Sequence, residues 1–424
     1  MKIMVIGGGG REHAVIKKLK ESPKCGKIYA LPGNGGISEL AECVDIKATD
    51  VSAIVDFAVE NKIDFAVVTP DDPLVLGAVD RLHEKGIKCF GPEASAAIIE
   101  GSKVFSKNLM KKYGIPTAGY EVFDDPSQAL DYLGHCTFPA VIKADGLALG
   151  KGVIIAESTL VAVNAIKKIM KDRIFGDSGS KIVIEEFLTG PEVSVLCFTD
   201  GKTIKPMVSS MDHKRAHDGD LGLNTGGMGT VAPNPYYTKD IAEICMKTIF
   251  RPTVEAMNKE GRRFKGCLYF GLMLTEDGPK VIEYNCRFGD PETQVVLPLL
   301  QSDLLEIMLA VEEERLGDAD VKFSSGAAAC VVMASGGYPE KYETGFGVKI
   351  GKLPENAFVF HAGTKKTAAG IVTSGGRVLG VSAVGKNLSD ALDTAYRAVS
   401  EITFESEFHR NDIGQKALSA LGEE

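Results

Sequence analysis

The chain has 424 residues, too many for one ordinary hydrophobic core, and at roughly 150 residues per domain about three domains are expected. Hydrophobic residues make up 44% and charged residues 25% of the sequence, as in ordinary globular proteins. The net charge of -9 at pH 7 argues against nucleic acid or a membrane surface as a partner, and it leaves room for a local basic pocket that binds phosphates.

Residues 1–101 alternate short apolar strands with helical patterns. Strands are expected at 3–6, 27–31, 65–69 and 88–90, and helices at 12–20, 51–60 and 74–84. Such alternation implies a parallel sheet that helices cover on both faces. The sequence therefore predicts a Rossmann-like N-terminal domain.

Four glycines, Gly7 to Gly10, join the first strand to the first helix. The dinucleotide fingerprint is incomplete, because Gly7-x-Gly9-x-x-Glu12 and Gly8-x-Gly10-x-x-His13 both lack the third glycine, and the second strand ends without an acidic residue for a ribose. NAD binding is therefore disfavoured. A second turn, Pro32-Gly33-Asn34, ends at the same sheet edge, which indicates either a site for a small phosphorylated ligand or two structural turns.

Lysines mark the next segment, beginning with Lys103 in the helical stretch 94–113. The strand 139–143 ends in Lys143, and a glycine-rich loop that contains Gly150-Lys151-Gly152 leads into the strand 153–156. A hairpin of this kind can lay backbone amides and ammonium groups over phosphates, although it is not a P-loop. A flexible surface hairpin is the alternative.

Two strands, 182–188 and 193–198, flank the turn Thr189-Gly190-Pro191. A hinge between two lobes offers backbone groups to a flat base, and Glu192 could accept hydrogen bonds from a ribose. The alternative is a plain hairpin.

A polar loop follows at 211–220 and continues into Asn224 to Gly229. His213 and His217 have the spacing of a helical metal site, but the glutamate of HExxH is absent because Lys214 follows His213. We expect a loop that faces a substrate rather than a zinc site, with a disordered surface loop as the alternative.

The strand at 281–284 ends in Glu283, Asn285 and Arg287 before Gly289-Asp290-Pro291 interrupts it. Alternation of side chains along a strand places Glu283 and Asn285 on one face. A carboxylate and an amide oxygen suit Mg²⁺, which leaves its other positions to water and phosphates. The alternative is a solvated edge strand.

From about residue 325 the pattern becomes β-rich and closes on a helix near 388–402. Nine cysteines stand singly, without a CxxC pair, which indicates reduced thiols. The first strand begins directly after Met1 and Lys2, and no apolar run reaches the ~20 residues of a membrane span. We therefore expect a cytoplasmic protein.

In combination, these segments resemble the ATP-grasp ligases. Single motifs are weak, but their order and spacing are specific and extend over essentially the whole chain. The motifs are Gly7–Ala14, Pro32–Asn34, Lys143–Val153, Asp212–Arg215, Asn224–Gly229, Glu283–Glu292 and Arg410–Gly414.

The resemblance implies an N-terminal Rossmann-like domain (1–101), a two-lobed ATP-grasp core (102–324) with a mobile small lobe at about 118–190, and a small β-rich C-terminal domain (325–424). It implies ATP-dependent ligation of glycine to 5-phosphoribosylamine through glycyl phosphate, a step of purine biosynthesis. ATP and Mg²⁺ or Mn²⁺ are the implied cofactors. The partners are these small molecules, with no nucleic acid or membrane, and a monomer is expected.

The resemblance also assigns roles to residues. Arg287, Asp212 and Lys143 would be catalytic, and Glu283 and Asn285 would hold the metal. ATP would meet Lys103, Lys143, Gly150, Lys151, Gly152, Glu185, Glu186, Phe187, Leu188 and Glu192. The other substrates would meet Gly8, Gly9, Gly10, Glu12, Pro32, Gly33, Asn34, Asp71, Asp212, Lys214, Gly226, Gly227 and Arg287. Asp71 follows Thr69-Pro70, where many relatives have Gly-Pro-Glu.

Other functions fit the sequence less well. A bicarbonate-using carboxylase of the same superfamily is the nearest alternative, and the loop Asp212–Arg215 and the tail Arg410–Gly414 favour the glycine ligase. An NAD-linked oxidoreductase is disfavoured by the incomplete fingerprint. A nucleotide-binding protein without catalysis would be expected to have lost Lys143, Glu283 or Asn285, and the sequence has all three.

Overall fold

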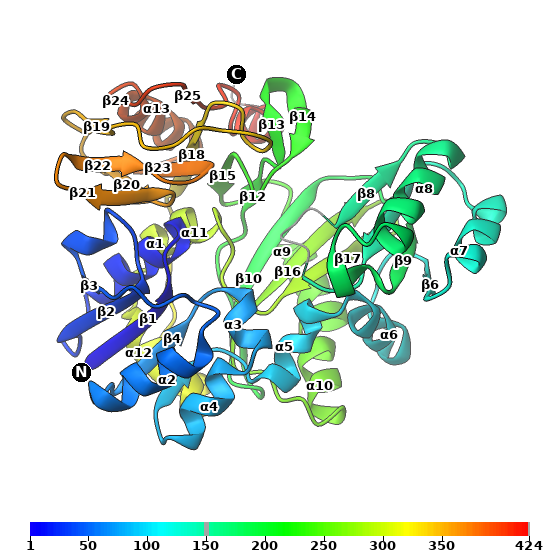
Figure 1. Ribbon diagram of the computed structural model, residues 1–424, viewed down its shortest axis with the longest axis horizontal. Coiled ribbons are helices and arrows are strands. Elements are labelled where there is room, and N and C mark those ends of the chain that lie inside the picture. The colour runs from blue at the N-terminus through cyan, green and yellow to red at the C-terminus, as the bar shows by residue number, and fades with distance from the viewer. Residues whose placement is uncertain (148–151, 423–424) are drawn as a thin grey trace.

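The computed structural model describes residues 1–147 and 152–422. Figure 1 shows the N-terminal domain and the C-terminal domain stacked on one side of the molecule, with the small lobe extended on the other side. No helix in the described part of the chain is both long and apolar enough to cross a membrane.

A five-stranded parallel sheet in the order β3-β2-β1-β4-β5 forms the N-terminal domain. Its strands are β1 (Lys2–Gly7), β2 (Lys27–Pro32), β3 (Glu42–Cys43), β4 (Phe65–Val68) and β5 (Lys88–Phe90), and its helices are α1 (Gly10–Leu19), α2 (Val51–Glu60), α3 (Asp71–Val75) and α4 (Ala78–Glu84). The single helix predicted at 74–84 is wrong, because α3 ends before Gly77, whose φ of +80° begins α4.

The ATP-grasp core has two lobes, each built on a four-stranded antiparallel sheet. The small lobe contains β6 (Tyr120–Phe123), β7 (Ala140–Ala144), β8 (Val153–Ala156) and β9 (Ile182–Glu186), with α7 (Pro126–Tyr132) and α8 (Thr159–Ile166). The large lobe contains β10 (Glu192–Thr199), β11 (Ile204–Pro206), β16 (Gly266–Thr275) and β17 (Gly278–Asn285), with α5 (Ala94–Gly101), α6 (Lys103–Tyr113), α9 (Lys239–Cys245) and α10 (Arg251–Lys259). A π-helical stretch at Met246–Phe250 joins α9 to α10, so the long helix predicted there is continuous.

The largest sheet of the C-terminal domain has the order β12-β15-β18-β23-β20, and β25 also pairs with β18. Its strands are β12 (Met211–Asp212), β15 (Gly229–Ala232), β18 (Ala327–Ser335), β20 (Ala357–His361), β23 (Arg377–Gly385) and β25 (Glu407–Phe408), and α13 (Leu388–Val399) packs on it. Three small ribbons accompany it: β13 (Arg215–His217) with β14 (Leu221–Asn224), β19 (Lys349–Ile350) with β24 (Ile402–Thr403), and β21 (Thr364–Thr367) with β22 (Gly370–Thr373). The short helix α14 (Gln415–Leu421) ends the described chain.

The domains share their hydrophobic cores. Helices α11 (Thr293–Leu299) and α12 (Leu304–Glu312) pack against α1 and β5, and α11 also packs against β18. One buried cluster accordingly runs from Ile3 through Phe198 and Phe288 to Cys330. Strands β12 and β15 also carry residues 211–232 into the C-terminal sheet. The predicted fold class, with a parallel N-terminal sheet, a two-lobed ATP-grasp core and a β-rich C-terminal domain, is confirmed.

Candidate active site

A cavity of about 660 Å³ lies where the small lobe, the large lobe and the loop after β12 meet. Many of the predicted site residues line it: Asp71, Lys103, Lys143, Gly152, Glu185, Glu186, Phe187, Leu188, Glu192, Asp212, Lys214, Gly226, Glu283, Asn285 and Arg287. Other predicted residues do not line it, namely Gly8, Gly9, Gly10, Glu12, Pro32, Gly33, Asn34 and Gly227. Gly150 and Lys151 lie outside the described residues.

Two lysines pair with one buried glutamate at the small-lobe side of the cavity, and a third lysine lines the same cavity. Lys143 and Lys107 place their Nζ atoms 3.0 and 2.9 Å from Glu185 Oε2. Lys143 also donates to the Ile282 carbonyl (3.2 Å), which joins β7 to β17 across the two lobes. Lys103 donates to the Gly146 carbonyl at 2.9 Å. The cluster thus joins α6, both lobes and the beginning of the glycine-rich loop.

The N-terminal end of helix α6 is fixed by hydrogen bonds that determine where Lys103 and Lys107 lie. Ser102 is its N-cap, with Oγ accepting a hydrogen bond from the Phe105 amide at 3.0 Å. Asp145 accepts from Ser102 Oγ and from the Val104 amide. Because Lys103 and Lys107 are four residues apart, they share one helix face toward the cavity.

Burial lowers the pKa values of two of these lysines. It lowers the pKa of Lys107 to about 8, against the opposing attraction of Glu185, while the neighbouring Lys143 lowers it further. Burial likewise lowers the pKa of Lys103, which Glu283 partly offsets. Near neutral pH the ammonium group of Lys107 is mostly charged, although pH 7 lies only about one unit below its pKa.

The segment between β9 and β10 connects the two lobes at the edge of the cavity. Phe187 is 38% exposed, and Leu188 lines the cavity together with the apolar side chains of Val141 and Ile155. At Gly190, a side chain would place its Cβ 2.1 Å from the Leu274 carbonyl, so the crossing between the lobes requires glycine. The hinge predicted at 189–191 thus joins the lobes, beside apolar walls that suit a flat ring.

Strand β17 presents Glu283, Asn285 and then Arg287 to the cavity. Its pairing with β16 shifts register between Val281 and Glu283. Alternation from Glu283 onward keeps these polar residues on one face, while Tyr284 and Cys286 are buried on the other. Glu283 and Asn285 therefore lie together as the sequence predicted.

Glu283 is suited to a cation. Burial would raise its pKa, but the ammonium groups of Lys214 and Lys143, together with Lys103 and Arg287, hold its pKa below the ordinary value. An ionised carboxylate and the Asn285 carbonyl are hard oxygen donors that fit Mg²⁺ or Mn²⁺. No cluster of three His, Cys, Asp or Glu side chains suited to a metal occurs within 1–147 and 152–422, so phosphates and water would complete the shell.

Arg287 is held by its neighbours. Its Nη2 atom lies 2.9 Å from Glu100 Oε1 and 3.4 Å from Asn285 Oδ1, and Nη1 donates to the Phe288 carbonyl. Glu100 also accepts from the Cys286 amide at 2.7 Å, so it fixes the backbone beside the arginine. The buried Nε of Arg287 has no partner among the described residues.

Asp212 and Lys214, in the segment after β10 and β11, also line the cavity. Burial and the neighbouring Glu292 raise the pKa of Asp212 well above its ordinary value, and its buried Oδ1 has no hydrogen-bond partner in the described structure. Lys214 Nζ lies 3.4 Å from Glu192 Oε2, whose charge raises the pKa of the lysine. A cationic ligand beside this carboxyl group would stabilise its ionised form and so lower its pKa.

The glycine turn Gly7–Gly10, which follows β1, does not line the cavity. Glu12 Oε2 accepts from the Gly9 amide at 2.5 Å, and Glu12 Oε1 pairs with Arg11 at 2.6 Å. The amide of Asn34 donates to the carbonyls of Gly8 and His361, at 2.9 and 2.6 Å. These side chains are thus engaged within the protein.

Asp290 connects the turn to the cavity that it lines. It accepts from the Arg11 amide at 3.4 Å and pairs with Arg377 Nη2 at 3.4 Å. Arg377 Nη1 donates to the Gly226 carbonyl at 2.6 Å and to the Asp290 carbonyl at 2.9 Å. The C-terminal domain therefore fixes the wall formed by Gly226 and Asp290.

Sequence comparison agrees with this architecture. The phosphoribosylglycinamide synthetase N domain matches residues 1–100, the ATP-grasp (A) domain 101–293 and the C domain 328–416. The chain belongs to the phosphoribosylglycinamide synthetase family.

Two phosphoribosylamine–glycine ligases are similar to this chain over almost their whole length. A phosphoribosylamine–glycine ligase of Caldanaerobacter subterraneus subsp. tengcongensis is 47% identical over 97% of this chain and 99% of that protein. The crystal structure of phosphoribosylamine–glycine ligase from Thermotoga maritima has a TM-score of 0.84 at 32% identity and covers 97% of this chain and 100% of that one. The biotin carboxylase domain of Hydrogenobacter thermophilus 2-oxoglutarate carboxylase shares the fold, with a TM-score of 0.75, 18% identity and coverage of 96% and 91%.

Sequence reasoning missed several residues that line the cavity or fix its walls. Lys107 was hidden in a helical pattern with four lysines, although its four-residue spacing from Lys103 was a usable signal. Glu100 and Arg377 act through Arg287 and Asp290, and no local pattern marks such distant pairs.

Proposed function

We propose that the chain ligates glycine to 5-phosphoribosylamine at the expense of ATP, through glycyl phosphate, in the cytoplasm. The family supplies the expectation of an ATP-grasp ligase. The observation that carries the proposal is one cavity in which the lysine cluster, the Glu283–Asn285 pair, Arg287 and Asp212 face one another.

The chemistry requires activation of a carboxylate, which is a poor electrophile. An oxygen of the glycine carboxylate attacks the γ phosphorus of ATP, and ADP leaves. The amine nitrogen of phosphoribosylamine then attacks the carbonyl carbon of glycyl phosphate, phosphate leaves, and the nitrogen loses a proton. The protein's share is positioning and charge neutralisation.

For ATP, we propose that Lys103 and Lys143 bind phosphate oxygens from the small-lobe side. Phe187 and Leu188 would pack against adenine, and Glu185 and Glu186 border that pocket. Glu283 and Asn285 would hold Mg²⁺ or Mn²⁺, which supplies charge neutralisation of the transferred phosphoryl group. Glu192 would accept hydrogen bonds from the ribose hydroxyls while its carboxylate also stays paired with Lys214.

For glycine, we propose that Asp212 receives the ammonium group and Arg287 the carboxylate. The raised pKa and unpartnered Oδ1 of Asp212 support a cationic ligand at that position. The guanidinium of Arg287 is always charged and suits both a carboxylate and a phosphoryl group. Its pairing with Glu100 leaves Nε without a partner among the described residues.

For phosphoribosylamine, we propose binding at the wall formed by Asp71, Gly226 and Asp290, next to the glycine turn. The glycine turn that contains Gly8, Gly9 and Gly10 would bind the sugar phosphate only if the phosphate displaced Glu12 from the Gly9 amide. The Glu12 carboxylate already accepts a hydrogen bond from that amide. Pro32, Gly33 and Asn34 would shape this edge, since both Asn34 amide hydrogens are engaged by carbonyls.

Release of ADP tests the proposal. The purified protein is supplied with MgATP and with glycine and phosphoribosylamine together, each alone, or neither, and parallel samples contain bicarbonate. Sustained release is expected only with both substrates. With glycine alone, hydroxylamine should trap one equivalent of glycine hydroxamate. Release that requires bicarbonate, or that needs neither substrate, would contradict the proposed ligation.

A further inference from the structure

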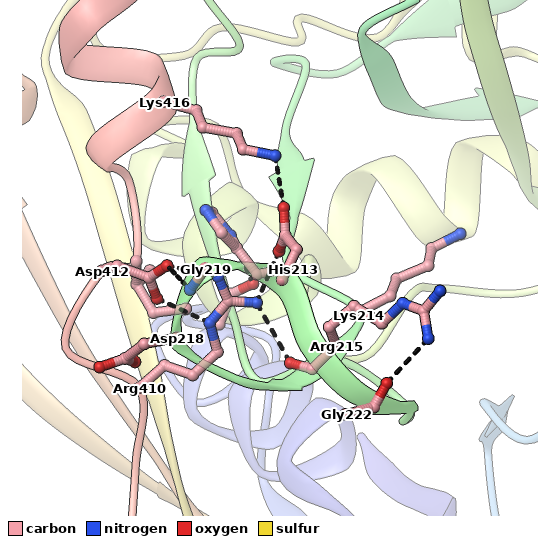
Figure 2. Close-up of polar contacts among 12 residues, drawn as sticks. His213, Lys214, Arg215, Asp218, Gly219, Gly222, Arg410, Asp412 and Lys416 are labelled. Atoms are coloured by element: carbon pink, nitrogen blue, oxygen red, sulfur yellow. Dashed lines mark hydrogen bonds and ion pairs between the residues drawn. The ribbon is translucent and has the colours of Figure 1, made fainter. Parts of the chain in front are cut away.

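The segment from Arg410 to Lys416, at the end of the C-terminal domain, lies against the hairpin β13–β14 (Figure 2). Arg410 is 1% exposed, and its Nη1 donates to the Arg215 carbonyl at 3.1 Å and to Asp220 Oδ1 at 2.8 Å. Nε and Nη2 donate to both oxygens of Asp412, at 2.7 and 2.8 Å. One guanidinium therefore binds the first residue of β13 and the last residue of the turn that follows it.

Neighbouring residues repeat the link between the segment and the hairpin. Asp412 Oδ2 accepts from the Gly219 amide at 2.8 Å. The Asn411 amide and side chain donate to the Asp218 carboxylate at 2.8 and 3.0 Å. Lys416 is hydrogen-bonded to Asp220, and both line the cavity. The contacts thus extend from the buried arginine to the cavity wall.

His213 connects this cluster to Asp212 and Lys214. The Gly414 amide donates to His213 Nε2 at 3.1 Å, so Nδ1 carries the proton and donates to the Gly229 carbonyl at 3.2 Å. Burial lowers the pKa of His213 to about 4, which keeps this neutral form near pH 7. Figure 2 shows Lys214 extended away from the cluster, whereas His213 lies against it.

The hairpin cannot hold this geometry by itself. An isolated two-stranded ribbon is marginal in water, and Leu221 and Leu223 are 66% and 52% exposed rather than packed in a core. Successive side chains of an extended chain point to opposite sides, so fixing His213 sets the direction of Asp212 and Lys214. Pairing of β12 with β15 fixes the backbone of Asp212, whereas the hairpin that follows Lys214 takes its order from outside.

We infer that Arg410, with Asp412 and Gly414, is a positioning element that orders residues 213–220 and thereby aims Asp212 and Lys214 into the cavity. The inference rests on the proposed function for its kinetic consequence. Arg410 itself does not line the cavity and touches none of the reacting groups. The C-terminal domain therefore contributes to amino acid binding through the loop rather than by direct contact.

Hydrogen exchange tests the ordering without reference to the reaction. In Arg410→Lys, the amides of residues 213–220 are expected to exchange at least about tenfold faster than in the wild type, because the shorter ammonium cannot form the forked contacts. Amides of β18 should exchange as before. Arg397→Lys, on the exposed face of α13, is the matched control and should leave both regions unchanged. Unchanged exchange in residues 213–220 of Arg410→Lys would overturn the inference.

Kinetics test the positioning. Arg410→Lys is expected to raise the KM for glycine about tenfold and to change the KM for ATP less than about twofold, since only the loop moves. In an Asp212→Asn background, Arg410→Lys should add nothing to the glycine defect. The inference would be overturned if Arg410→Lys raised the KM values for glycine and ATP equally. It would also be overturned if Arg410→Lys raised the KM for glycine as much in the Asp212→Asn background as in the wild type.

Two outcomes separate this inference from the proposed function. If Asp212→Asn leaves the KM for glycine unchanged, the assignment of Asp212 is wrong, while hydrogen exchange still decides the role of Arg410. If Asp212→Asn raises that KM and Arg410→Lys does not, the positioning role is wrong. Should Arg410→Lys fold poorly, Asp218→Ala removes only the two exposed hydrogen bonds from Asn411 and should show a smaller change in the same direction.

Discussion

Lys107 offers a test in which stability and function should change in opposite directions. Its ammonium group is buried, with the side chain 3% exposed, and it donates to Thr117 Oγ1 at 2.8 Å and pairs with Glu185 at 2.9 Å. Lys107→Met keeps the length of the side chain and removes the charge. Among the described residues, Glu185 would then keep Lys143, at 3.0 Å, as its one cationic partner.

The pKa of Lys107 gives the change in stability, and the ordinary strength of a charged hydrogen bond gives the change in ATP affinity. The fall in the pKa of Lys107 from 10.5 to about 8, caused first by burial, corresponds to a cost of about 3 kcal/mol for the folded protein at neutral pH, at ~1.4 kcal/mol per unit. Between pH 8 and 10.5 the unfolded chain binds more protons at this group, so the free energy of unfolding rises with pH in that window. Loss of a hydrogen bond to a charged group costs about 1.5–3 kcal/mol, which is about 10- to 150-fold in affinity if it falls on ATP binding.

Lys107→Met should therefore raise the KM for ATP by at least about tenfold while its Tm stays equal to or above that of the wild type at pH 7. Steady-state kinetics with varied ATP and thermal unfolding from pH 7 to 10 measure the two effects, and the difference in stability should shrink as pH rises above 8. Lys111→Met, on an exposed position of α6, is the control. A lower Tm with an unchanged KM for ATP would refute the reasoning, because Lys107 would then serve only the fold.

Three further changes test other parts of the site. Glu283→Ala should lower kcat at least about a thousandfold with an unchanged circular dichroism spectrum, since the proposed metal loses its only carboxylate, and activity within a few-fold of the wild type would rule the assignment out. Gly9→Val should raise the KM for phosphoribosylamine and spare that for ATP, because its Cβ would lie 2.8 Å from Glu12 Oε2; an ATP defect would relocate the site. Burial lowers the pKa of His13 to about 3, so the unfolded chain binds more protons there below pH 6.5 and the free energy of unfolding should fall by up to roughly 3 kcal/mol toward pH 4. In denaturant titrations His13→Gln should lose less stability over that range, and an equal loss would show that other groups dominate.

Local patterns predicted much of the fold and of the cavity. The helix expected at 51–60 has those bounds, because apolar side chains recur at helical spacing and Asp50 caps the first turn. The paired strands around Gly278 and the polar face of Glu283 and Asn285 are also observed. These features depend on a few consecutive residues, and consecutive residues are what a single sequence displays.

Long-range features could not be predicted in this way. Strands β12 and β15 join a sheet whose other strands begin almost a hundred residues later, at Ala327. Similarly, the sequence shows Glu12 only as a helix residue after a glycine turn. In the structure its carboxylate accepts the hydrogen bond from the Gly9 amide that was expected to bind a phosphate. A capping box and an anion site share one pattern, and only the packed structure shows which partner occupies the amide.

The charges around the cavity bear on why a metal should be needed. Of the described side chains that line it, ten are acidic and seven are basic, an excess of three negative charges if all are ionised. ATP would bring further negative charge into a space where Glu185 and Glu283 already face the lysines. Desolvated like charges repel strongly, so Lys103, Lys107 and Lys143 cannot balance both the carboxylates and the phosphates. A divalent cation on Glu283 and Asn285 relieves this repulsion, and on these grounds ATP affinity should fall sharply when the metal is chelated.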